Sequence, residues 1–249
     1  MKHVLSVCTA CALSVFPASA QDAEWLGEGS LSAGYTTGNT ETTDLGLGLD
    51  LARETQVWKT SLEAVADFGE TDGVETRNRW FLAGQLDRQV NDRLYGFVRA
   101  SHERDQFSGF DSRSFLGGGL GYEILAGEAT SWSVEAGPGL KIDEVKRRVT
   151  TDEDGSARIV PATTQESFSV VGASNFAHDF NENVGFTHET SLLYAEESTQ
   201  LGNIAAVTAD LTDALSARVS FEVRHDTDPP ENFEATDTAT RVSLVYTFQ

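Results

Sequence analysis

The sequence predicts an all-β protein, an antiparallel transmembrane β-barrel of about twelve strands, within a range of roughly ten to fourteen. Three observations predict this fold. A secretory leader precedes the domain, the apolar residues after it recur with a period of two, and the segments with that period are long enough to cross a bilayer. The chain of 249 residues is expected to hold one such domain, residues 21–249, after a leader over residues 1–20.

The leader has the three parts of a signal peptide. A short polar start containing Lys2 is followed by an apolar run over residues 4–16 and by the small residues Ala18-Ser19-Ala20. The apolar run is shorter than the ~20 residues that a membrane-spanning helix needs. We therefore expect cleavage before Gln21 and export through the inner membrane.

Composition excludes several classes of function. Cys8 and Cys11 both lie in the leader, so a mature chain would have no disulfide, cysteine nucleophile or thiolate metal site. The net charge is −21, and it becomes −22 when Lys2 leaves with the leader. So acidic a chain repels nucleic acid, and no nucleic-acid partner is expected.

Alternation of apolar and polar residues defines the strands. Leu45, Leu47, Leu49 and Leu51, for example, alternate with polar residues and glycines. Each strand reaches the about nine residues that a tilted strand needs to cross a bilayer. Glycine is frequent within these segments, and Pro138 suggests a bulge. The predicted strands are 24–37, 43–53, 57–68, 75–89, 93–105, 111–124, 130–144, 163–177, 183–196, 203–212, 215–226 and 237–248.

The connections between strands fall into two classes. With a periplasmic N-terminus, the odd-numbered connections are external and include both long loops, and the even-numbered ones are uniformly short, as in transmembrane barrels. The external set is Gly38–Thr42, Gly69–Val74, Gln106–Phe110, Val145–Ala162, Glu197–Gly202 and Thr227–Thr236. The periplasmic set is Arg53–Gln56, Val90–Asp92, Leu125–Ala129, His178–Glu182 and Thr212–Ala214.

The two faces of the strands differ in polarity. Aromatic residues near strand ends suit the two girdles at the membrane interfaces: Trp58, Phe68, Trp80, Tyr122, Trp132, Tyr246 and Phe248. Charged residues on the other face are candidates to line the lumen: Glu63, Asp67, Arg77, Arg79, Arg99, Glu103, Arg113 and Glu135. Alternation alone also fits a soluble, lipocalin-like barrel with its apolar face inside, although the strand lengths and loops favour the membrane.

No residues form a recognisable catalytic or metal site. The histidines are scattered, at His102, His178, His188 and His225, and a nucleophile-elbow motif is absent from the sequence. Asp152-Glu153-Asp154-Gly155 and Asp226-Thr227-Asp228 carry oxygen ligands suited to calcium, but their spacing does not match an EF-hand, which favours solvated loop tips. We expect no enzyme activity, no cofactor and no metal.

The last strand resembles the C-terminal signature that the barrel-assembly machinery reads in outer-membrane barrels. In this signature alternating apolar residues end in an aromatic, here Val242, Leu244, Tyr246 and Phe248, with Gln249 as one extra residue. This resemblance implies that the assembly machinery and outer-membrane lipid are partners of the chain.

Residues 25–40 resemble the opening of one family. Trp25-Leu26-Gly27-Glu28-Gly29 leads through Gly34-Tyr35 to Gly38-Asn39-Thr40, similar to the YdiY-like salt-induced outer membrane proteins, the domain of unknown function 481 family. The resemblance implies an outer-membrane barrel, with a link to osmotic stress, and supplies no substrate or catalytic residue.

Several functions fit a monomeric barrel of this kind. They are small-solute or ion passage, envelope integrity under osmotic stress, adhesion through the external loops, and, for a soluble barrel, periplasmic ligand binding. The lumen charges fit an open path and a plug equally well, because strand number does not decide how a barrel is filled.

Overall fold

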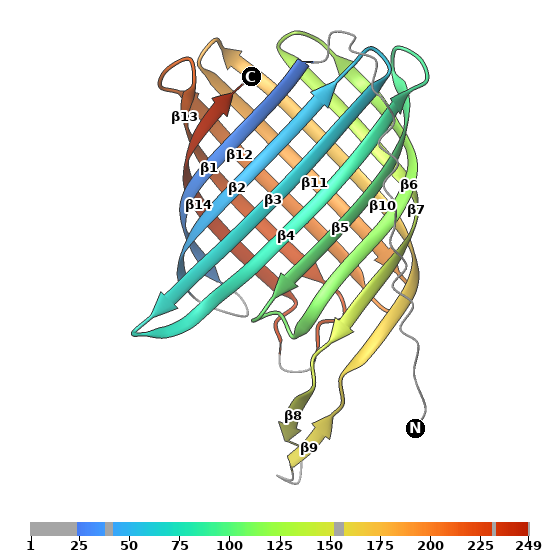
Figure 1. Ribbon diagram of the computed structural model, residues 1–249, viewed down its shortest axis with the longest axis vertical. Helices are drawn as coiled ribbons and strands as arrows, with labels where there is room; N and C mark the ends of the chain where they lie inside the picture. Colours follow the sequence, from blue (N-terminus) through green and yellow to red (C-terminus); the bar gives the residue numbers. More distant parts are fainter. Residues whose placement is uncertain (1–23, 38–41, 152–156, 231–232, 249) are drawn as a thin grey trace, which may run out of the picture.

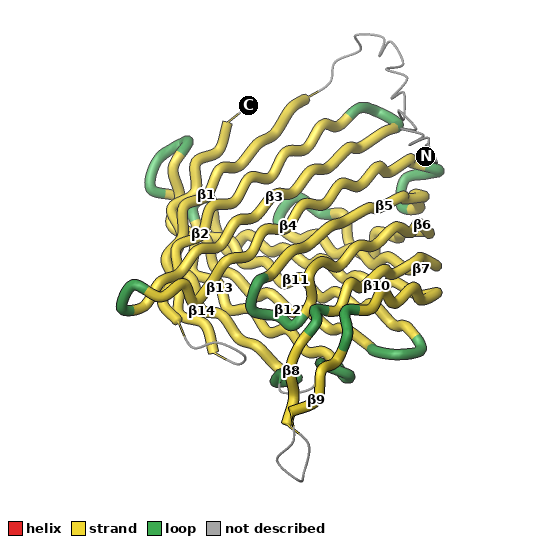
Figure 2. The backbone as a smooth tube through the Cα atoms, turned by 60° about the horizontal axis from the view of Figure 1, so that its bottom comes forward, coloured by secondary structure: helices red, strands yellow, loops and turns green. Residues whose placement is uncertain are grey.

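Twelve long strands close into one antiparallel barrel in the computed structural model of the chain, which describes residues 24–37, 42–151, 157–230 and 233–248. Neighbours in the ring are also neighbours in sequence, and β1 pairs with β14 to close it (Figures 1 and 2). The predicted fold class and strand number are therefore confirmed. The predicted leader, residues 1–20, lies outside the described residues.

The strands are long and agree with the alternating segments of the sequence. Each has at least twelve residues, enough to cross a bilayer at a tilt. Their bounds are β1 (Glu24–Thr37), β2 (Thr42–Glu54), β3 (Trp58–Thr71), β4 (Val74–Gln89), β5 (Leu94–Asp105), β6 (Phe110–Ala126), β7 (Thr130–Val145), β10 (Thr163–Asn181), β11 (Val184–Ala195), β12 (Thr199–Asp210), β13 (Leu215–Asp226) and β14 (Thr236–Phe248).

The two ends of the barrel differ. At the termini side, where β1 begins and β14 ends, short turns join the strands (Figure 1). The opposite end, the loop side, carries the connections over residues 146–162 and 227–235. Two of the predicted loops are wrong in length: Gly69–Val74 and Glu197–Gly202 shrink to residues 72–73 and 196–198, because the strands pair almost to their tips.

The longest connection contains a hairpin that the sequence did not predict. Strand β8 (Arg148–Thr151) pairs with β9 (Ala157–Val160) in a separate two-stranded sheet. This hairpin projects past the barrel wall at the loop side (Figure 1). Val149 and Ile159 face each other across it, and both side chains are exposed. The predicted acidic tip, residues 152–155, lies outside the described residues.

The apolar side chains face outward. Large apolar residues on every barrel strand are exposed, whereas most of the buried side chains are polar or charged and point inward. This polarity is that of a transmembrane barrel and opposite to that of a soluble lipocalin-like barrel, so the soluble alternative is wrong for this fold. Among the described residues, no helix is long and apolar enough to span a membrane. The predicted girdle residues Trp58, Phe68, Trp80, Tyr122, Trp132, Tyr246 and Phe248 are all exposed.

The wall between β6 and β7 depends on glycine. Its strands approach so closely that a Cβ at Gly119 would overlap the carbonyl oxygen of Ala136, and a Cβ at Gly137 that of Gly118. The predicted bulge at Pro138 is wrong. The register is the same on both sides of it with β6 and with β10, because Pro138 removes one N–H from the ladder without adding an unpaired residue to the strand.

Candidate functional site

The candidate site is the barrel lumen. Strand alternation directs every second side chain inward, and these side chains form two groups at different depths. The first group, near the loop side, is a charged cluster in which cations and carboxylates are equal in number. Its members are Arg77, Arg79, Arg113, Lys141, Arg224 and Arg241 with Asp44, Asp67, Glu103, Asp143, Glu222 and Asp226.

Asp67 is the centre of the charged cluster. Its side chain is 1% exposed, and its Oδ2 lies 3.1 Å from Arg79 Nη1 and 3.3 Å from Arg241 Nη2. Arg77 Nη2 lies 3.5 Å from the same oxygen. Arg79 comes from the neighbouring strand, but Arg241 reaches Asp67 across two strands from β14. One buried carboxylate therefore links β4 and β14 through β3, across an arc of five of the twelve strands.

Two ion pairs cross the lumen itself. Arg224 Nη1 on β13 lies 3.1 Å from Glu103 Oε1 on β5, and these strands are opposite each other in the ring. Arg113 Nη2 on β6 lies 2.7 Å from Asp226 Oδ2, also on β13. A solute moving along the lumen would have to pass these pairs.

Connections also meet over the loop-side mouth. A Cβ at Gly109, whose φ is 78°, would lie 2.8 Å from the Phe233 ring and 3.0 Å from Pro230, so glycine is needed for both conformation and space. Lys146 Nζ donates to the carbonyl oxygens of Asp105 and Gln106, at 3.2 and 2.6 Å. Partial burial lowers the pKa of the Lys146 ammonium below its usual value.

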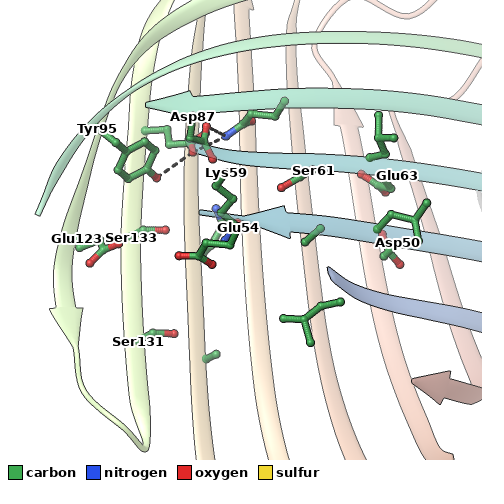
Figure 3. A pocket seen from close by; sticks show the side chains of 18 of the residues that line it. Asp50, Glu54, Lys59, Ser61, Glu63, Asp87, Tyr95, Glu123, Ser131 and Ser133 are labelled. Carbon is green, nitrogen blue, oxygen red and sulfur yellow. Dashed lines mark hydrogen bonds between the residues drawn. The ribbon is translucent and has the colours of Figure 1, made fainter. Parts of the chain in front are cut away.

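The second group of inward side chains lines a cavity of about 900 Å³ near the termini side, here called the vestibule. Figure 3 shows Asp50 and Glu63 at one end of it and Tyr95, Asp87 and Glu123 towards the other. Its charge is unbalanced, because eight carboxylates line it with two cations, and one further cation, Arg218, pairs with Glu28 at 2.8 Å. The carboxylates are Glu28, Asp50, Glu54, Glu63, Asp87, Glu123, Glu135 and Glu189, and the cations are Lys59 and Arg99.

Aromatic side chains narrow one wall of the lumen. Phe97 and Phe115 point inward from β5 and β6 and are buried. Tyr95 Oη donates a hydrogen bond to Glu135 Oε1 at 2.9 Å, and Gln85 Nε2 donates to the same oxygen at 2.8 Å (Figure 3). Glu135 is thus fixed against the wall by its two donors.

The histidines do not come together. His102 lies 2.8 Å from Ser114 Oγ on the outer face, while His178 and His225 contact threonines elsewhere. No group of three or more histidine, cysteine, aspartate or glutamate side chains within the described ranges could hold a metal ion. The described lumen is lined by charged side chains.

The structure divides the predicted lumen residues between the two groups. Asp67, Arg77, Arg79, Glu103 and Arg113 belong to the charged cluster, and Glu63, Arg99 and Glu135 line the vestibule. Sequence reasoning missed their partners Asp44, Asp143, Glu222, Arg224, Asp226 and Arg241. Period-two alternation, applied to every charged residue of each strand, would have found them.

Comparisons with known proteins agree with this structure. The family described as "Protein of unknown function, DUF481" matches residues 29–248, so the chain belongs to this family, as its opening residues predicted. The uncharacterized protein YdiY of Escherichia coli (strain K12) is 29% identical over 227 residues, covering 88% of this chain and 82% of that protein.

Two solved structures share the fold. The NanC porin superposes with a TM-score of 0.54 at 12% identity, covering 88% of this chain and 98% of its own. The translocator domain of the autotransporter NalP from Neisseria meningitidis gives 0.51 at 10% identity, covering 93% and 90%. At such low identity these structures support the barrel fold alone.

Proposed function

We propose that this member of the DUF481 family is a monomeric, non-catalytic outer-membrane barrel that passes small cationic solutes, with its termini side in the periplasm. The exposed apolar belt needs a lipid partner, and the short turns at the termini side are typical of periplasmic turns. The exposed Val242, Leu244, Tyr246 and Phe248 are available on the outer face as a signal for the barrel-assembly machinery.

The observation that carries the proposal is the charge of the vestibule. With Arg218 paired to Glu28, eight carboxylates still outnumber three cations, and this excess concentrates cations and repels anions at the mouth of the path, because a cleft lined mainly by one sign of charge focuses its field. A neutral or cationic vestibule would favour other solutes. The proposed selectivity therefore comes from the termini side and not from the balanced cluster.

Planar bilayers containing the purified mature chain test this. We expect a reversal potential in a KCl gradient that shows preference for K⁺ over Cl⁻. Replacing Glu63→Gln together with Glu189→Gln should weaken that preference, because both carboxylates line the vestibule. Glu144→Gln, which changes an exposed carboxylate of the outer face, is the matched control. Preference for Cl⁻, or equal effects of the two changes, would contradict the proposal.

The β8–β9 hairpin favours a second candidate function, surface adhesion, because it projects past the barrel with Val149 and Ile159 exposed. Replacing residues 146–161 by a short linker should abolish adhesion and leave conductance intact if the hairpin is the functional part. The link to osmotic stress stays a prediction from the family resemblance, tested by growth of a deletion strain at high osmolarity.

A further inference from the structure

We propose that the two cross-lumen pairs, Glu103–Arg224 and Arg113–Asp226, form a releasable latch that closes the loop side of the lumen. The inference rests on the proposed passage of solutes and adds its regulation: the path is shut in this conformation, and it opens when the latch breaks. The four latch residues come from the same two opposed walls, β5–β6 on one side and β13 on the other.

The latch separates two cavities. The vestibule lies on its termini side, and a much smaller cavity of about 30 Å³, lined by Arg224 and Glu222, lies at the charged cluster. No described residue lines both cavities. Side chains of opposite walls meet at the level of the charged cluster, and the proposed closure lies there.

Three of the latch residues keep a charged partner on their own wall. Arg224 also contacts Glu222 of its own strand, and Glu103 also accepts from Arg79 Nε of the next strand at 2.6 Å. Breaking a buried ion pair is normally prohibitive because it leaves an uncompensated charge. Here, release of the Glu103–Arg224 pair leaves each charge with a partner, so an open arrangement is accessible.

In the second pair, Arg113 keeps a charged partner on its own wall and Asp226 keeps a backbone hydrogen bond. Arg113 lies 3.9 Å from Asp143 of the adjacent strand β7, and its guanidinium stacks on the Phe110 ring at 3.5 Å from the centroid. Asp226 Oδ1 accepts from the backbone N–H of Asp228 at 3.1 Å. Both partners of this pair can therefore withdraw to their own walls.

Exposure distinguishes the latch from the pairs that hold the wall. The side chains of Arg224 and Glu103 are 36% and 25% exposed, whereas those of Arg79 and Asp67 are 5% and 1% exposed. Water thus already reaches the cross-lumen pairs and can replace their contacts during release. The buried wall pairs lack this access and stay in place.

The test removes one pair without changing the lumen charge. In Glu103→Ala with Arg224→Ala one carboxylate and one cation disappear, so selectivity should persist while the path widens. We expect single-channel conductance in planar bilayers to rise at least about threefold, because the narrowest segment limits conduction. Arg88→Ala with Glu144→Ala removes the same two charge types from the outer face and should leave conductance at the wild-type level.

The possible outcomes separate the latch from the passage of solutes. Equal conductance of wild type and variant would overturn the latch and leave the passage function standing. Folded barrels that are silent in both forms would overturn the latch and the passage function together. A rise in conductance with loss of K⁺ preference would support the latch and contradict the vestibule as the selective element. If the alanine variant does not fold, Glu103→Gln with Arg224→Gln keeps the side-chain volume and is judged by the same conductance criterion.

Discussion

Replacement of Asp67 by asparagine should destabilise the barrel more than any other single removal of charge in the lumen. The buried carboxylate faces three guanidinium groups at 3.1, 3.3 and 3.5 Å, and the amide that replaces it keeps the shape and loses the charge. Two of the arginines retain another carboxylate, since Arg79 contacts Glu103 and Arg241 contacts Glu222. Arg77 has no second ion-pair partner among the described residues.

The expected loss in the free energy of unfolding follows from the number of arginines left without a carboxylate. Leaving one buried charge uncompensated costs about 3 to 5 kcal/mol, and we take the lower end because two of the three arginines keep a partner. A loss of about 3 kcal/mol corresponds to roughly a hundredfold change in the unfolding equilibrium. Urea titration of the refolded barrel in lipid vesicles, followed by the heat-modifiable gel shift, measures it.

The chain offers a control variant and a rescue variant for this prediction. Asp213→Asn makes the same chemical change in an exposed turn of the termini side and should leave the urea midpoint unchanged. Adding Arg77→Gln to Asp67→Asn removes the uncompensated charge and should recover part of the loss. A destabilisation by Asp67→Asn below about 1 kcal/mol, the value of an ordinary exposed pair, would refute the role of Asp67 as the centre of the cluster.

Three further predictions follow from single contacts. Gly119→Ala should abolish folding, because its Cβ would overlap a backbone oxygen of β7, whereas Gly29→Ala, which meets open space, should fold normally by the gel-shift assay. Tyr95→Phe should lower the free energy of unfolding by about 1.5 to 3 kcal/mol, the value of a hydrogen bond to a charged group, in the urea titration. Phe248→Ala should lower the yield of assembled barrel in cells, and Phe168→Ala, at an exposed site on β10, should not.

The sequence predicted the wall better than the lumen. Strand bounds followed from alternation, and β1 and β5 agree with the prediction to within one residue at each end, because each register places a whole apolar face in lipid. The Asp72-Gly73 turn, with φ of 52° and 78°, is the two-residue hairpin signal that would have corrected the predicted loop at Gly69–Val74. The hairpin β8–β9 was not predicted, because short strands outside the barrel have no long alternating pattern in the sequence.

Which charges meet across the lumen could not be predicted. Alternation places Glu103 and Arg224 inward, but their pairing depends on the closed ring of twelve strands, which brings residues 121 positions apart to opposite points of one level. Alternation places Phe97 and Phe115 inward, but it cannot show how the lumen accommodates them. The Phe115 ring lies where a Cβ at Gly117 or Gly139 would be, so these two glycines leave room for it. Both facts belong to tertiary packing rather than to local sequence.

The charged composition of the proposed latch favours a lumen that can open. Replacing buried ion pairs by well-packed apolar residues of similar volume is often neutral or stabilising, so charge is a poor choice for a permanent filler. The same barrel fills space with aromatic rings where filling has no electrostatic purpose, at Phe97 and Phe115. The level at which the proposed latch closes the lumen instead contains partly exposed ion pairs, and Glu103 and Arg224 each have a second charged partner on their own wall. A barrel that is permanently plugged is expected to extend the aromatic filling, and the charged composition of this level therefore favours the proposed latch over a permanent plug.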